Sequence, residues 1–126
     1  MLSFATSFSP NSNSFALFVN EKYEYEDKKQ TLSKDVSKKI NLYLKLLKSK
    51  KQKSEISSID ISDKKKCFII KIKNKKEKYY FEEVGGSFFT YIKNDKTINS
   101  IDIYADSLKE NKSNLSKFFS EFIFEI

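Results

Sequence analysis

Few residues of this chain belong to the types that carry enzyme chemistry. The 126-residue sequence contains no histidine and a single cysteine, Cys67. Without histidine there is no imidazole base, no histidine-containing catalytic triad and no zinc site of the usual kind. A nucleophilic cysteine needs an activating base or a helix N-terminus. Since Cys67 begins an apolar run, we interpret it as a buried, unreactive thiol.

The carboxylates are the remaining groups that could hold a metal ion. Glu24, Glu26 and Asp27 form a cluster, but two lysines follow at once and the spacing is not that of a calcium-binding loop. Glu82 and Glu83 fall at the polar edge of a predicted helix. We interpret both groups as solvated surface. We therefore predict no catalytic, cofactor-binding or metal-binding residue in this chain.

Phosphate-binding and base-stacking patterns are equally weak. A phosphate loop needs several glycines between a strand and a helix, whereas the corresponding turn at 73–76 reads Lys-Asn-Lys-Lys. The aromatic run at 78–81 could stack on single-stranded bases, but core packing explains it as well. All 24 basic residues are lysine, and the net charge is +7. Because the favoured residue types have A/T-rich codons and specific nucleic-acid sites rely on arginine, the composition argues against a nucleic-acid partner.

Length and composition predict one domain, residues 1–126. A single cysteine excludes an internal disulfide and fits a reducing compartment. No apolar run approaches the roughly 20 residues of a membrane span, and the first residues lack the pattern of a secretory signal. We therefore expect a cytoplasmic protein with no membrane partner.

Hydrophobic periodicity divides the chain into strands and amphipathic helices. Strand patterns occupy residues 2–7, 15–20, 55–62, 66–73 and 97–105. A polar turn around Pro10 separates the first two strands, a charged loop follows over 21–30, and a turn joins the third and fourth strands as a hairpin. The first helix begins near Thr31, with that residue or Ser33 as its N-cap, and its exit loop begins at Lys48.

The second predicted helix, around residues 81–92, contains both glycines of the chain, Gly85 and Gly86. Glycine inside a helix costs about 1 kcal/mol relative to alanine, so we expect Gly85 to let the helix approach the sheet closely. The alternative is that the pair separates two short helices. A last helix over 113–126 keeps its apolar stripe to Ile126, as in a fragment of a longer protein or a self-contained domain. This order predicts an α/β domain with a mixed sheet and helices on both faces.

The order of several of these segments along the chain is also informative. They are Leu46-Leu47-Lys48-Ser49 at a helix end, the strand 67–73, the turn Lys75-Lys76-Glu77, the helical Glu82-Glu83-Val84-Gly85-Gly86, and the strand Ser100-Ile101-Asp102-Ile103. From about Phe15 to its end, the chain resembles the N-terminal domain of the leucyl aminopeptidase (cytosol aminopeptidase) family.

The resemblance implies a three-layer α/β/α domain, similar to a macrodomain, that supports assembly of a homohexameric peptidase removing N-terminal amino acids. In that family, two divalent metals (zinc or manganese) and the catalytic residues belong to a C-terminal catalytic domain, to which nothing in this chain corresponds. We therefore expect the chain alone to be inactive, with that catalytic domain and further copies of itself as partners. The alternative is a macrodomain-like module that binds ADP-ribose or another anionic ligand.

Overall fold

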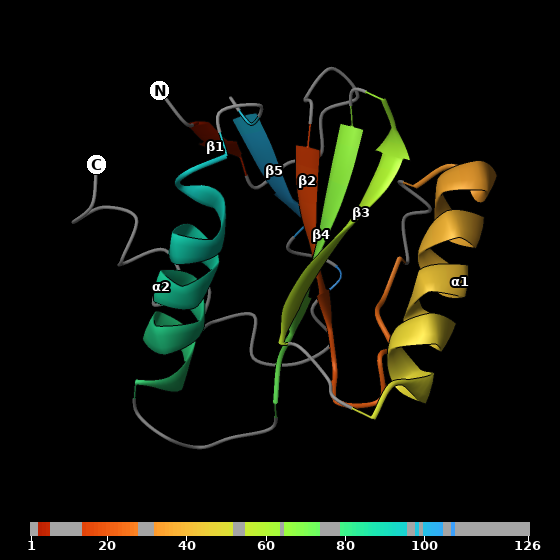
Figure 1. Ribbon diagram of the computed structural model, residues 1–126, viewed down its shortest axis with the longest axis horizontal. Helices are drawn as coiled ribbons and strands as arrows, with labels where there is room; N and C mark the ends of the chain where they lie inside the picture. The colour runs from red at the N-terminus through yellow and green to blue at the C-terminus, as the bar shows by residue number, and fades with distance from the viewer. Residues whose placement is uncertain are drawn as a thin grey trace.

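Five strands of the described chain form one mixed sheet, which has a helix on each side (Figure 1). The computed structural model describes residues 3–5, 14–27, 32–51, 55–63, 65–73, 79–95, 98, 100–104 and 107. The elements are β1 (Ser3–Ala5), β2 (Ser14–Val19), α1 (Lys34–Ser49), β3 (Ile56–Ser62), β4 (Lys65–Lys71), α2 (Tyr80–Ile92) and β5 (Ser100–Tyr104). The prediction of an α/β domain with a mixed sheet is confirmed. The turn predicted around Pro10 and the helix predicted over 113–126 lie outside the described residues.

The strand order across the sheet is β1-β5-β2-β4-β3. The first four of these strands run parallel, and β3 pairs antiparallel with β4, which confirms the predicted hairpin. The strand β5, although the last of the described elements along the chain, lies between β1 and β2. The carboxyl ends of β2, β4 and β5 therefore meet at one edge of the sheet.

The central strand β2 is buried along its whole length because both of its faces are covered. Phe15, Leu17 and Val19 pack on the α1 side, whereas Ala16 and Phe18 pack on the α2 side. This alternation of faces also explains the imperfect pattern in β3, where Ile56 packs on the α2 side and Ile59 and Ile61 pack on the α1 side. The continuous apolar run at 15–19 is thus the pattern of a doubly covered strand.

The helix α1 begins where the sequence predicts a cap. The Ser33 side chain accepts a hydrogen bond from the backbone N–H of Val36 at 3.2 Å, the usual N-cap arrangement. Ile40, Leu44 and Leu47 are buried against the sheet. The predicted exit loop begins too early, because the helix runs through Ser49 and the Lys50 N–H still bonds back to the Leu47 carbonyl.

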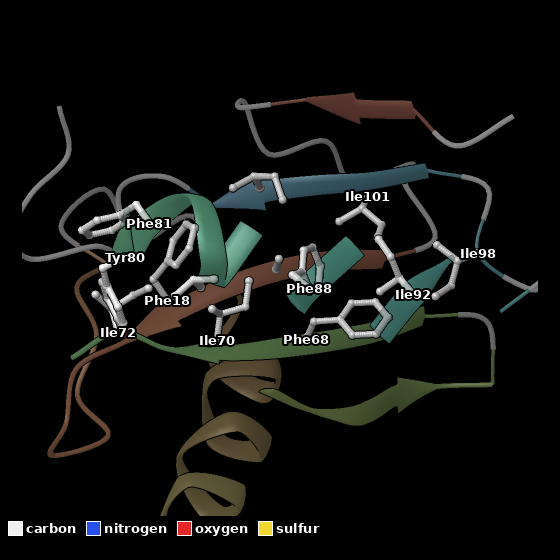
Figure 2. Close-up of a cluster of buried hydrophobic side chains, with 13 residues drawn as sticks. Phe18, Phe68, Ile70, Ile72, Tyr80, Phe81, Phe88, Ile92, Ile98 and Ile101 are labelled. Atoms are coloured by element: carbon white, nitrogen blue, oxygen red, sulfur yellow. The ribbon is translucent and has the colours of Figure 1, made fainter. Parts of the chain in front are cut away.

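The helix α2 runs without interruption through both glycines, so the alternative of two short helices is wrong. Gly85 is buried and Gly86 is half-buried. Figure 2 shows the side chains that pack between this helix and the sheet, with Phe68 of β4 beside Phe88 of α2. Gly85 belongs to the buried stripe of α2.

Ser107 lies beyond the end of β5 and is hydrogen-bonded to both β2 and β5. Its Oγ accepts a hydrogen bond from the backbone N–H of Phe18 at 2.9 Å and donates one to the Tyr104 carbonyl at 2.5 Å. The side chain is buried, so this one hydroxyl joins β2 to the chain that follows β5.

The substitution Ser107→Ala is expected to lower the free energy of unfolding by about 1–2 kcal/mol, because it removes the acceptor of a buried N–H. Urea denaturation followed by circular dichroism measures the loss. Ser87, exposed on α2, is the matched control, and Ser87→Ala is expected to change stability by no more than about 0.5 kcal/mol. Equal values for the two variants would show that the Ser107 hydroxyl contributes nothing.

Candidate functional site

The single cysteine lies in the middle of the core, as the sequence predicts. Cys67 is on β4, is fully buried and pairs in register with Phe15 of β2. Burial raises the pKa of the Cys67 thiol well above its ordinary value of 9.0, and the nearby Lys65 offsets this only in part. A buried, protonated thiol is a poor nucleophile, so Cys67 is a packing residue.

This burial predicts a pH dependence of stability. Below pH 9 the thiol is protonated in both states, whereas above pH 9 only the unfolded chain ionises and unfolding releases a proton. The free energy of unfolding should therefore fall with rising pH by up to about 1.4 kcal/mol per pH unit from this group. Urea titrations at pH 8, 9 and 10 should show a steeper loss for the native chain than for Cys67→Ala. Parallel losses in the two proteins would contradict the buried, protonated thiol.

The acidic residues 24–27 make contacts with neighbouring groups. No group of three or more histidine, cysteine, aspartate or glutamate residues that could hold a metal occurs in the part of the chain that the structure describes. Glu24 is exposed, as predicted, and its carboxylate accepts a hydrogen bond from the Asn20 amide at 3.1 Å. Asp27 departs from the prediction of a solvated residue, because it is half-buried and accepts hydrogen bonds from the Leu32 N–H and the Tyr104 hydroxyl. Its role is to tie the segment after β2 to β5.

Lys73 is the one residue of the predicted lysine-rich turn that lies within the described chain, and it is bonded to neighbouring groups. The Lys73 ammonium lies 2.6 Å from the Glu55 carboxylate, and this contact raises the pKa of Lys73. The Lys73 backbone N–H donates to the Tyr80 hydroxyl at 2.7 Å. Tyr80 and Phe81 are buried, which leaves Tyr79 as the exposed aromatic residue at this point. Core packing therefore explains Tyr80 and Phe81, and they offer no stacking surface for bases.

A groove lined by several lysines lies along α1. Two adjoining hollows, of about 520 Å³ and about 610 Å³, share Asp27, Asn41 and Lys45 as lining residues. They lie between the segment that follows β2 and the outer side of α1, and together they are called the α1 groove here. The lysines that line it are Lys22, Lys34, Lys38, Lys45 and Lys48.

One wall of the α1 groove is the segment after β2, which its own hydrogen bonds hold in place. The Asn20 Oδ1 atom accepts from the backbone N–H groups of Lys22 and Glu24, both at 2.9 Å. Tyr23 has φ 60°, the one positive φ of a residue other than glycine in the described chain. Such a backbone costs about 1–3 kcal/mol and persists where its surroundings enforce it. Here the Lys71 Nζ atom lies over the face of the buried Tyr23 ring, 5.1 Å from the ring centroid.

The floor of the α1 groove is polar and uncharged. The Tyr25 hydroxyl lies 3.3 Å from the Asn41 Oδ1 atom and donates to it. Burial raises the pKa of Tyr25, and a hydrogen bond with the Ser37 side chain lowers it in part. Tyr25 therefore stays protonated at neutral pH and adds no charge to the groove lining.

Positive charge is concentrated on this helix. The 16 residues of α1 contain five lysines and one acidic residue, Asp35, whereas α2 contains two glutamates and no lysine. Codon bias acts on both helices alike, so it does not account for the difference. The two acidic residues of the groove, Glu24 and Asp27, are engaged by the hydrogen bonds described above.

The lysines of this lining favour an anionic group over a cationic one, and the described residues include no cluster of metal-binding side chains there. Sequence reasoning missed this lining because the lysines were attributed to composition. The available signal was the spacing of Lys34, Lys38 and Lys45, which places the three on one stripe of a helix.

None of the helices within the described residues is both long and apolar enough to cross a membrane. Comparison of the chain with protein-family models, with curated proteins and with solved structures finds no match. The functional proposals below therefore depend on the residues and contacts of the chain itself and on the resemblance stated above.

Proposed function

We propose that this chain is a non-catalytic domain of the kind found at the N-terminus of leucyl aminopeptidases, and that it supports assembly of the peptidase rather than cleaving peptides. The observation that carries this proposal is the place of the Gly85-Gly86 pair. In the resemblance, the pair lies inside a helix that follows a buried strand and precedes the next one. In the structure, β4, α2 with both glycines, and β5 follow one another in this order.

The chemistry of the described residues is consistent with a structural role. The buried Cys67 is protonated, and the described residues contain no metal-binding cluster. The residues present therefore do not fit the two zinc or manganese ions of the family, which we assign to a separate catalytic domain. We further propose that the domain has a three-layer, macrodomain-like arrangement, that it assembles as a homohexamer and that it is cytoplasmic. The positions of α1 and α2 on opposite faces of the sheet support the first of these.

Two measurements test the assembly role. The purified chain should release no product from leucine p-nitroanilide, with or without zinc or manganese. When it is mixed with a leucyl aminopeptidase catalytic domain from the same source, light scattering should detect a complex containing both polypeptides. An unrelated domain with the same net charge of +7 controls for charge-driven association. Metal-stimulated turnover by the chain, or its failure to join the catalytic domain, would overturn the proposal.

Binding of an anion such as ADP-ribose is the second candidate function, and the lysines of the α1 groove favour it. Against it, the segment from Asn20 to Asp27 contains none of the glycines that let a backbone wrap a pyrophosphate. A rise in melting temperature with ADP-ribose that Lys38→Gln abolishes would support this function. An unchanged melting temperature would exclude it.

A further inference from the structure

We infer that the α1 groove is a docking site for an acidic, leucine-containing segment of a partner protein. The inference goes beyond assembly with a catalytic domain and does not depend on it. It follows from the charge of the groove rim, the length of that rim and one exposed leucine beside it.

Charge complementarity selects an acidic occupant. Lys34, Lys38 and Lys45 are exposed on one stripe of α1, and Lys48 lines the same groove. Each ammonium group would meet a carboxylate at the rim, where such pairs guide association and fix the register of the bound chain. Asp27 and Glu24 also line the groove and keep their negative charge, but the lysines of the described lining outnumber them five to two, so the excess charge remains positive.

The length of the rim suits a polypeptide segment. From Lys34 to Lys48 the helix rises about 21 Å at 1.5 Å per residue, which matches six or seven residues of extended chain. Leu42 lines the groove and is 60% exposed, so it offers an apolar contact between the lysines. A small inorganic anion could not pack against this leucine, whereas an apolar side chain of a bound peptide could. The exposed leucine therefore favours a peptide as the occupant.

Nucleic acid and membrane fit the groove less well. The Tyr25 ring is half-buried and its hydroxyl is engaged with Asn41, so the groove presents no exposed aromatic face on which bases could stack within the described residues. A basic helix binds a bilayer by inserting its apolar face, but Ile40, Leu44 and Leu47 are buried against the sheet. An acidic protein segment is therefore the occupant that the contacts favour.

The probe for the test is a fluorescein-labelled peptide of 14 residues in which glutamates recur around two leucines, and fluorescence anisotropy measures its binding. We expect Lys38→Gln combined with Lys45→Gln to weaken binding about tenfold, and added salt to weaken it further. The matched control combines Lys50→Gln with Lys93→Gln, which removes the same charge from exposed positions outside the groove lining. This control should bind within about twofold of the native chain.

The apolar contact has its own matched pair. Leu42→Ser should weaken binding about threefold to tenfold, whereas Leu46→Ser should leave it unchanged, because Leu46 is 53% exposed on the same helix but does not line the groove. All of these side chains are exposed, so the melting temperatures of the variants should match that of the native chain.

Three outcomes would overturn the inference. The first is that the acidic peptide does not bind measurably. The second is that the groove variants and the control variants weaken peptide binding equally. The third is that a competitor binds more tightly than the peptide and its binding depends on Lys38 and Lys45 in the same way. The competitors are a 14-nucleotide oligothymidylate and phosphatidylserine vesicles. A preference for the first would reassign the groove to nucleic acid, and a preference for the second would reassign it to a membrane surface.

Discussion

Replacing Phe68 with alanine is expected to lower the free energy of unfolding by about 3–5 kcal/mol, the range for removing a buried phenylalanine. Phe68 is 2% exposed on β4. Its ring meets that of Phe88 edge-to-face at 5.6 Å between centroids and that of Tyr91 at 6.1 Å. The loss is large because Phe68 provides a contact between the sheet and α2. It amounts to a third or more of the free energy of unfolding of many small domains.

The matched control for this prediction is Tyr91, which contacts the same Phe68 ring but is 47% exposed. We expect Tyr91→Ala to lower the free energy of unfolding by no more than about 1.5 kcal/mol, the value of an edge-to-face pair with little additional burial. Equilibrium urea denaturation measures both variants. Equal losses would show that Phe68 is not the centre of the contact between α2 and the sheet.

A side chain at Gly85 is expected to be the second large perturbation. Gly85 lies on the buried stripe of α2 together with Val84 and Phe88. Gly85→Leu would gain at most about 1 kcal/mol of helix propensity, but it forces four carbons into packed space, which costs about 1–3 kcal/mol or more. The net expectation is a loss of up to about 2 kcal/mol.

The neighbouring glycine supplies the control. Gly86 is half-buried, and its carbonyl accepts a hydrogen bond from the Thr90 hydroxyl at 3.0 Å. Gly86→Leu should therefore leave stability unchanged or raise it by up to about 1 kcal/mol. Thermal and urea unfolding of the two leucine variants give the comparison. A stabilising Gly85→Leu would mean that α2 has room for a side chain against the sheet, and the close approach expected from the sequence would then be wrong.

Most of the elements could be predicted from local patterns, because each one buries a recognisable face. The spacing from Leu32 to Leu47 predicts α1, and Ser33 is one of its two predicted caps. The strand order could not be predicted. It depends on the pairing of β5 with β2 through Ala16 and Ile103, and residues so far apart along the chain leave no periodic signal.

The lysine stripe of α1 leaves a signal in the sequence, but the groove beside it could not be predicted, for a related reason. The charged stretch at 21–30 looks like an ordinary loop, and the lysines of α1 look like ordinary solvated residues. The groove exists only because Asn20 turns the chain back along the helix and Asp27 fastens it to Tyr104 of β5. The hydrogen bonds of Asn20 are local, but the bond between Tyr104 and Asp27 joins residues far apart along the chain, which local sequence does not relate.

The position of β5 also constrains how this protein emerges from the ribosome. The strand β2 ends at Val19, and its neighbour β5 begins only at Ser100, so about 80 residues must be synthesised before the gap between β1 and β2 can be filled. At roughly 5–20 residues per second, the nascent chain presents an open strand edge for several seconds. Translation of this polypeptide thus includes an interval in which a chaperone such as a holdase would find backbone groups to bind, and that interval ends when the last strand enters the sheet.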